Sequence, residues 1–243
     1  MPKGIGVTIL MYHSIGYNAV FFTVTPENFK WQMDYLKANG YQTAFLSELV
    51  GWLRTGAVLP AKTTVLTFDD GYQDIYTNAF PILKEHGFKA TIFLATDFIG
   101  GAMNNRSNVP LKMLSWQQIE EMYQSGLIDF QPHSSGHYDL DRVTLAEAEG
   151  QILKSRQLIE AGLNKKCTLF AYPRGKYSLE LIRVLKKNGF EAAVTVREGV
   201  VLERTDVLEL SRNSIDSSTT REQFIGKISY SVELFNRIFK WWK

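Results

Sequence analysis

Two aspartates and two histidines have the types and spacing to form a metal site with a base beside it. Asp69 and Asp70 end a predicted strand in the run Thr-Phe-Asp-Asp-Gly, residues 67–71. Adjacent residues leaving a strand point in different directions, so one carboxylate can bind a metal while the other accepts a proton. His133 and His137 are spaced so that a helical turn or a compact loop brings both imidazoles to one ion. With Asp70 they form a two-histidine, one-carboxylate set that zinc, iron, cobalt and nickel accept.

Each of these patterns also has a plainer interpretation. Asp-Asp-Gly is common in turns, and two histidines at this spacing also occur on polar surfaces. A third run, Phe-Ala-Tyr-Pro-Arg-Gly at 170–175, ends another predicted strand. Its Pro and Gly could turn backbone N–H groups toward an oxyanion, or could simply connect the strand to a loop. The three runs gain weight together, because active sites of parallel α/β barrels form at the carboxyl ends of the strands.

Short β-rich runs alternate with helical patterns along most of the chain. Thr25 followed by Pro26 predicts a helix start, and Thr144 with Glu147 predicts a capping box. Strands are expected over 7–11, 64–68, 90–94, 127–131, 168–172, 192–196 and 208–210. Helices are expected over 25–40, 71–87, 115–126, 144–162, 179–187 and from 220 onward. This alternation favours an α/β fold, a parallel sheet with helices outside it, open or closed into a barrel.

Composition and chain length favour a single folded unit. The 243 residues are 45% hydrophobic and 21% charged, as in ordinary globular proteins. No run rich in Pro, Gly or Ser divides them, so one domain is expected over 1–243, with an amphipathic C-terminal helix over 220–243. The longest irregular stretch, 97–113, is expected as a surface loop beside the site.

Charge and cysteine content limit the partners and the compartment. Basic and acidic residues nearly cancel, 27 against 25, so no nucleic-acid partner is expected. The single cysteine, Cys167, allows no internal disulfide and is expected to be a structural thiol. No signal peptide or membrane-spanning run is recognisable, which favours the cytoplasm as the sequence stands. An extracellular or cell-envelope location is expected instead if an export signal has been removed.

The order of the three runs resembles that of the polysaccharide deacetylase family, the NodB homology domain. Thr-Phe-Asp-Asp-Gly, His-Ser-x-x-His and Tyr-Pro-x-Gly follow one another, and similarity continues around them over roughly residues 5–215. The resemblance implies a distorted (β/α) barrel with about seven parallel strands. It also implies a metal-dependent hydrolase that removes N-acetyl groups from an N-acetylhexosamine polysaccharide or a glycoconjugate such as a glycolipid. The Tyr-His pair at 12–13 and the departures described below are most like the branch acting on poly-N-acetylglucosamine.

The resemblance also implies a role for each residue of the site. Asp69 is expected to be the catalytic base. Asp70, His133 and His137 are expected to hold a divalent metal, with Zn2+ first and Co2+, Ni2+ or Fe2+ as alternatives. Such an ion brings the pKa of water toward about 7 and polarises the acetyl carbonyl. The backbone N–H of Tyr172 is the expected donor to the oxyanion.

Two features of the family are missing from this sequence. Ala171 stands where many members carry an arginine that steadies the base, and Arg174 or Arg212 is the candidate replacement. The family's later Leu-x-His motif, the usual source of the general acid, has no counterpart at 208–212. His13 follows the first predicted strand and should reach the same face as the other site residues. It is therefore the candidate acid, with a supporting or structural role as the alternative.

Other functions are compatible with the same residues. The metal set would also serve an O-acetyl esterase or a small-molecule amidohydrolase, and a relative without activity would bind carbohydrate only. The expected partner is an acetylated polysaccharide or glycolipid, and the oligomeric state is left open. The final run at 240–243, Lys-Trp-Trp-Lys, could contact a membrane surface weakly, or the C-terminal helix could pack over the barrel.

Overall fold

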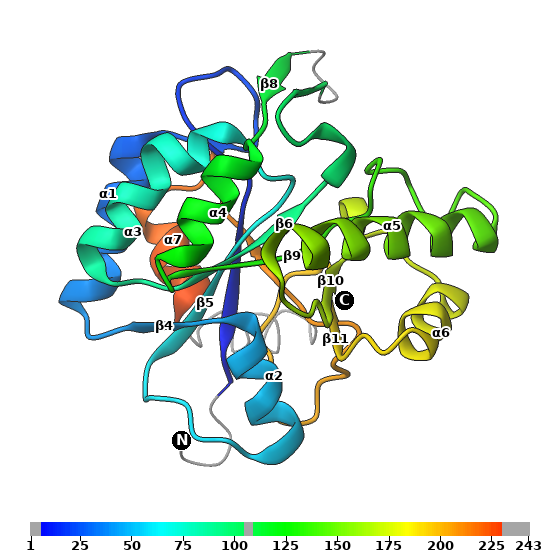
Figure 1. The fold of residues 1–243 in the computed structure, drawn as a ribbon. Helices are drawn as coiled ribbons and strands as arrows, with labels where there is room; N and C mark the ends of the chain where they lie inside the picture. The colour runs from blue at the N-terminus through cyan, green and yellow to red at the C-terminus, as the bar shows by residue number, and fades with distance from the viewer. Residues whose placement is uncertain (1–5, 105–108, 230–243) are drawn as a thin grey trace, which may run out of the picture.

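A parallel β-sheet lies at the centre of the protein, with helices around it (Figure 1). The computed structural model describes residues 6–104 and 109–229. The hydrogen-bonded order is β12-β1-β5-β6-β9, and the short strand β4 also pairs with β5. Every pairing in this sheet is parallel, as the alternation of strands and helices predicts. The strands are β1 (Thr8–Tyr12), β4 (Gln42–Ala44), β5 (Thr63–Phe68), β6 (Ala90–Leu94), β9 (Ile128–Pro132) and β12 (Asn213–Ser214).

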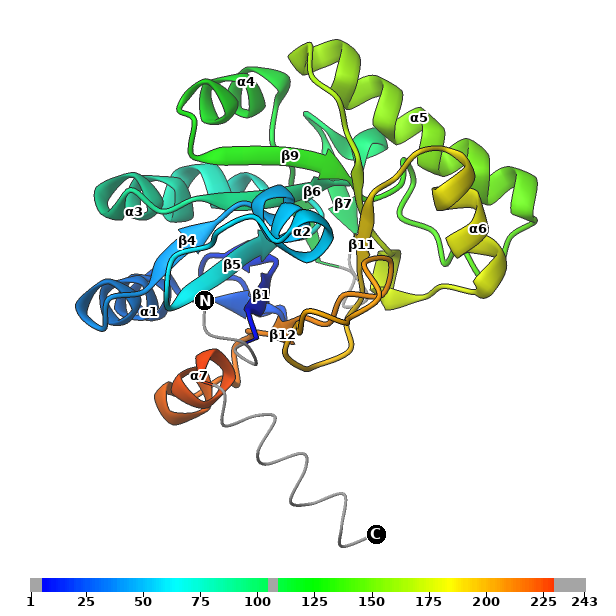
Figure 2. The ribbon, with the colours of Figure 1, turned by 90° about the horizontal axis from the view of Figure 1, so that it is seen from below.

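A second, two-stranded parallel sheet lies beside β9 (Figure 2). It consists of β10 (Leu169–Ala171) and β11 (Ala192–Val194). On the β9 side, the Leu169 N–H donates to the Gln131 side chain at 3.1 Å. On the other side, Val194 forms a single parallel bridge with Leu210. Closure of the two sheets into a complete barrel stays a prediction, because these joins are not ladders of backbone hydrogen bonds.

The helices begin largely where the sequence predicts them. Thr25, Ser115 and Thr144 each accept a hydrogen bond from a backbone N–H in the first turn that follows. In Figure 1, α1, α3, α4 and α7 lie together beside the main sheet, and α5 and α6 lie beside β10 and β11. The helices are α1 (Pro26–Ala38), α2 (Leu46–Thr55), α3 (Phe80–His86), α4 (Trp116–Gln124), α5 (Leu145–Leu163), α6 (Leu179–Lys187) and α7 (Arg221–Ile228). The shorter helical turns are Ile75–Ala79, Thr96–Phe98 and Pro173–Gly175.

The inner side of the curved sheet is filled by apolar side chains and covered at one end by α2. Leu46, Leu49 and Val50 of this helix belong to one buried cluster with Val65 and Phe93 of the sheet. α2 lies at the amino ends of the strands (Figure 1), so the carboxyl ends are left for the loops that carry the site. Burial of this cluster stabilises the scaffold that holds those loops.

Several observed elements are absent from the predicted set, among them the strand β4 and the helix α2. β4 is only three residues long. The N-cap of α2 is Phe45, so no Ser, Thr, Asp or Asn marks the start of this helix. The Glu48 side chain instead accepts a hydrogen bond from the Phe45 N–H at 2.7 Å.

The predicted strand at 208–210 is reduced to a single parallel bridge, between Leu210 and Val194. Asp206 forms a turn there, because its carbonyl accepts from the Glu209 N–H and its side chain accepts from the Leu208 N–H. The chain rejoins the sheet only at β12, which pairs with β1. The apolar pattern of this run therefore reflects burial of its leucines, and only Leu210 pairs with a neighbouring strand.

The stretch 97–113 and the C-terminal helix each match their predictions in part. The first contains an antiparallel hairpin, β7 (Ala102–Asn104) and β8 (Pro110–Lys112), which lies beside the cavity described below, as predicted. α7 begins after Thr220 as predicted but ends at Ile228. Residues 230–243 lie outside the described residues, so the predicted membrane contact of 240–243 stays a prediction. Within the described residues, no helix has the length and apolar character needed to cross a membrane.

Candidate active site

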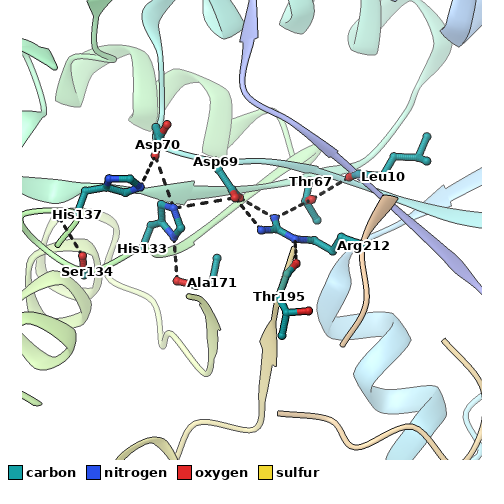
Figure 3. Close-up of polar contacts among 10 residues, drawn as sticks. All are labelled: Leu10, Thr67, Asp69, Asp70, His133, Ser134, His137, Ala171, Thr195 and Arg212. Atoms are coloured by element: carbon teal, nitrogen blue, oxygen red, sulfur yellow. Dashed lines mark hydrogen bonds and ion pairs between the residues drawn. The ribbon is translucent and has the colours of Figure 1, made fainter. Parts of the chain in front are cut away.

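The residues predicted to act together meet at the carboxyl ends of the central strands (Figure 3). Asp69 and Asp70 follow β5 directly, and His133 follows β9. His137 lies in the loop from β9 to α5, and His13 follows β1. Because these strands run parallel in one sheet, their ends deliver all five side chains to one edge.

Asp70, His133 and His137 form a compact set of metal-ligand side chains. Asp70 Oδ1 lies 3.2 Å from His137 Nε2 and 3.5 Å from His133 Nε2. His133 Nδ1 donates to the Ala171 carbonyl at 2.8 Å, which leaves the lone pair of Nε2 facing Asp70. Asp70 Oδ1 is buried and accepts no hydrogen bond from the described residues. An unpartnered buried carboxylate oxygen beside two imidazole lone pairs fits a divalent cation.

The backbone around this set is held in conformations that ordinary residues rarely adopt. Asp70, Ser134 and His137 have φ values of 71°, 62° and 54°, in the left-handed region. Each such residue costs about 1–3 kcal/mol, so the surrounding structure must impose the geometry. Ser134 Oγ accepts from the His137 N–H at 3.0 Å. Gln151 of α5 accepts from the Gly136 N–H at 2.7 Å, so the long helix fixes the loop that carries the second histidine.

Asp69 is held beside the metal-ligand set by a buried arginine (Figure 3). Arg212 Nη1 and Nη2 donate to Asp69 Oδ1 and Oδ2 at 2.6 and 2.7 Å, a bidentate pair. Arg212 Nε donates to the Thr195 carbonyl at 2.9 Å and Nη1 to Thr67 Oγ1 at 3.2 Å. Burial by itself would raise the pKa of Asp69, but the charge and the hydrogen bonds of Arg212 oppose burial and hold this pKa well below its usual value. Asp69 therefore stays ionised, with Oδ2 4.0 Å from His133 Nε2.

The structure separates the two arginines that could replace the one missing at Ala171. Arg212 reaches Asp69 from a position 143 residues later in the chain. Arg174 does not contact Asp69, because its Nη1 donates to Asp139 Oδ1 at 2.5 Å. Arg174 still lines the cavity at another point.

His13 faces the same cavity from the end of β1. Its Nδ1 is buried without a hydrogen-bond partner among the described residues, and its ring stacks on Phe22 at a centroid distance of 5.0 Å. Burial is the main cause that lowers the pKa of His13, although the nearby carboxylates oppose it. Asp74 fixes the following loop, accepting from Ser14 Oγ at 2.5 Å and from the Ile15 N–H at 3.2 Å. Asp74 is not among the residues predicted from the sequence, where its only signal is an acidic residue shortly after Asp-Asp-Gly.

The base, the three metal-ligand residues and His13 line one cavity of about 320 Å³. Its apolar wall includes Phe21, Phe22, Tyr72, Met103 and Val196. The volume and the mixture of apolar walls with a few convergent polar groups are typical of small-ligand sites.

Tyr172 does not line this cavity, which corrects its predicted role as the oxyanion donor. Its N–H donates to the Val194 carbonyl at 3.2 Å, extending the β10–β11 pairing by one residue. Its buried hydroxyl donates to the Leu208 carbonyl at 3.2 Å. The turn that follows brings Arg174 to the cavity wall with a left-handed φ of 55°. No hydrogen bond of the Arg174 N–H is found among the described residues, and Arg174 lines the cavity, so this amide replaces that of Tyr172 as the candidate oxyanion donor of the third run.

The fold and the site define the general class of the protein as a hydrolytic enzyme. An ionised carboxylate beside an aspartate–histidine cluster, at the carboxyl edge of a parallel sheet, is an arrangement suited to metal-assisted hydrolysis of an acyl group. The family model for polysaccharide deacetylase matches residues 57–193, more than half of the chain. The chain belongs to this family of deacetylases, and the predicted resemblance is confirmed.

Relatives and solved structures agree with this assignment. A poly-beta-1,6-N-acetyl-D-glucosamine N-deacetylase of Staphylococcus epidermidis is 33% identical over 199 residues, which cover 79% of this chain and 67% of the relative. The Streptococcus pyogenes deacetylase PplD, solved with acetate, is 27% identical, with a TM-score of 0.82 over 93% of this chain and 99% of that chain. IcaB from Ammonifex degensii has a TM-score of 0.83 at 24% identity, over 94% of this chain and 98% of that chain, and supports the fold alone.

Proposed function

We propose that this protein is a divalent-metal-dependent N-deacetylase that acts on an N-acetylhexosamine polysaccharide. The observation that carries the proposal is the division of labour between two adjacent carboxylates. Asp70 faces His133 and His137, while Asp69 is held by Arg212 and left as a base beside them. Such a pair of roles suits hydrolysis of an amide, which needs both activation of the carbonyl and removal of a proton from water.

Asp70, His133 and His137 would hold the ion. Their donor set suits Zn2+ and also Co2+, Ni2+ or Fe2+. A divalent ion supplies Lewis acidity, which makes water more acidic and polarises a carbonyl group.

The remaining steps belong to side chains and amides of this chain. Asp69 accepts a proton from the water that attacks the acetyl carbon, and Arg212 keeps its two oxygens oriented. The Arg174 N–H donates to the carbonyl oxygen as negative charge develops on it. His13 gives a proton to the amine nitrogen as the C–N bond breaks, so that acetate and a free amine leave.

The substrate class is supported by the relatives and by the cavity. The Staphylococcus epidermidis relative is named for poly-beta-1,6-N-acetyl-D-glucosamine, an N-acetylated hexosamine polymer. The cavity places apolar side chains next to the base and the metal-ligand set, where an acetyl methyl group would be buried. A glycolipid bearing the same acetylated sugar presents the same chemistry to this site.

Acetate release by metal-stripped protein tests the proposal. Zinc, cobalt, nickel and iron are added back singly, with β-1,6-linked N-acetylglucosamine oligomers as substrate and acetylxylan as the O-acetyl comparison. We expect metal-restored release from the oligomers and little from acetylxylan. Faster release from acetylxylan would indicate an O-acetyl esterase, and oligomer binding without release under any metal would indicate a carbohydrate-binding relative.

A further inference from the structure

A second hollow, of about 380 Å³, adjoins the cavity that holds Asp69 and Asp70. His137, Arg174, Met103 and Asn104 line both spaces. A ligand in the cavity can therefore continue past His137 into the second hollow. None of the catalytic steps above uses this space.

Tyr138 gives the second hollow an aromatic wall. It directly follows the metal-ligand residue His137, and 54% of its surface is exposed. Its ring lies against Gly136, because a Cβ added at that glycine would come within 2.5 Å of ring atom Cε2. A large aromatic side chain that is open to solvent is a ready contact surface, and with only two side-chain torsions it has little conformational entropy to lose.

Two arginines give the same hollow its polar groups. Asp139 accepts from Arg174 Nη1 at 2.5 Å and lies 3.9 Å from Arg142 Nε. Each guanidinium carries five N–H donors in a rigid plane, so both keep donors beyond those that face Asp139. Arg174 lines both spaces, so its donors lie where a ligand passes from one to the other.

We propose that this Tyr138 hollow binds the sugar unit next to the one that is deacetylated, an inference that rests on the function proposed above. A hexosamine ring has an apolar face of C–H groups, which packs on an aromatic ring, and hydroxyl and carbonyl oxygens around its edge, which accept from arginine. The volume of the hollow falls in the range of about 300–1,000 Å³ found for ligand pockets. The site is thus selective for oligomers over the free monosaccharide.

Substrate length is the variable that tests this proposal. We expect kcat/KM for acetate release to rise roughly tenfold from N-acetylglucosamine to its β-1,6-linked oligomers, a gain equal to one good contact. In Tyr138→Ala and Arg142→Ala this gain should shrink several-fold, mainly through KM for the oligomers. Leu179→Ala removes an exposed apolar side chain of α6 that does not line either space, and should leave the gain unchanged.

A binding measurement separates this proposal from the proposed function. Calorimetry on the metal-free protein should show tighter binding of oligomers than of the monosaccharide, and Tyr138→Ala should weaken it. The proposal that the Tyr138 hollow binds a sugar unit would be overturned by either of two results. One is binding or kcat/KM that does not depend on oligomer length, and the other is a gain in kcat/KM with length that Tyr138→Ala leaves unaltered. Absence of acetate release at every length would instead overturn the proposed function, while length-dependent binding would still support the hollow.

Discussion

Arg212 and Asp69 form a bidentate ion pair in which both side chains are buried. The two N–H···O distances are 2.6 and 2.7 Å, and the residues lie 143 positions apart in the sequence. The pair joins the segment before β12 to the end of β5, next to the metal-ligand set. One arginine therefore orients the base and connects the last strand of the sheet to a central one.

Replacing Arg212 with methionine should lower both stability and turnover. The Asp69 carboxylate would stay buried without its cation, which costs about 3–5 kcal/mol of the free energy of unfolding at neutral pH. The pairing lowers the pKa of Asp69 in the folded state, so its stabilisation is present above the unfolded pKa of about 4 and is lost as pH falls. Urea unfolding at pH 7 and at lower pH measures the difference, with exposed Arg183→Met as the control.

The same variant should shift the pH profile of kcat/KM. Without Arg212 the pKa of Asp69 rises, so the acid limb of the profile should move to higher pH. Arg212→Lys keeps a charge but cannot reproduce the bidentate geometry and should be intermediate. An unchanged acid limb in both variants would show that Arg212 is structural only.

Asp69→Asn should abolish turnover while the metal stays bound. Loss of a general base lowers the rate by about 10²–10⁴-fold. Metal content is measured by elemental analysis after gel filtration, with Asp70→Asn as the comparison that should lose metal. Metal loss in Asp69→Asn would contradict the assignment of Asp69 as the base outside the ligand set.

His13→Ala should lower turnover more than it lowers metal content. Without a proton donor to the amine, we expect kcat for the amide substrate to fall about 10²-fold. Hydrolysis of 4-nitrophenyl acetate should fall much less, because its leaving group departs without protonation. Equal losses on both substrates would remove His13 from the role of general acid.

Asp74 is expected to position the loop that carries His13. Asp74→Ala removes the acceptor of Ser14 Oγ and of the Ile15 N–H, which should cost about 1–3 kcal/mol of stability and reduce turnover. Asp74→Asn keeps an acceptor for the Ile15 N–H, so its turnover should stay close to that of the wild type.

The stability difference between Asp74→Asn and the wild type should also depend on pH. Burial raises the pKa of Asp74, so the charged form is disfavoured in the folded protein. This unfavourable contribution is present above the folded pKa and disappears as pH falls toward the unfolded value. Asp74→Asn should therefore gain stability relative to the wild type at pH 7, and the gain should shrink in acid. A constant difference from pH 7 to pH 4 would contradict this explanation.

Most of the fold could be predicted from local patterns. The strand before Asp69, the capped helix after Thr144 and the helix at 179–187 all lie where side-chain alternation and capping residues indicate them. The misses have the same local origin. The helix after Phe45 has no capping residue of the usual kind, and the leucines at 208–210 alternate as in a strand although a turn at Asp206 limits their pairing to Leu210.

The sequence by itself picked out Asp69, Asp70, His133 and His137 as the candidate base and metal ligands, because each pair lies close together in the chain at the end of a strand. Only the tertiary structure decided which arginine reaches Asp69 and which residue of the third run lines the cavity. Those outcomes depend on contacts between segments far apart in the chain, such as Arg212 with β5 and Tyr172 with β11. Local pattern carries no record of such contacts, since they arise when the two sheets and their loops pack together.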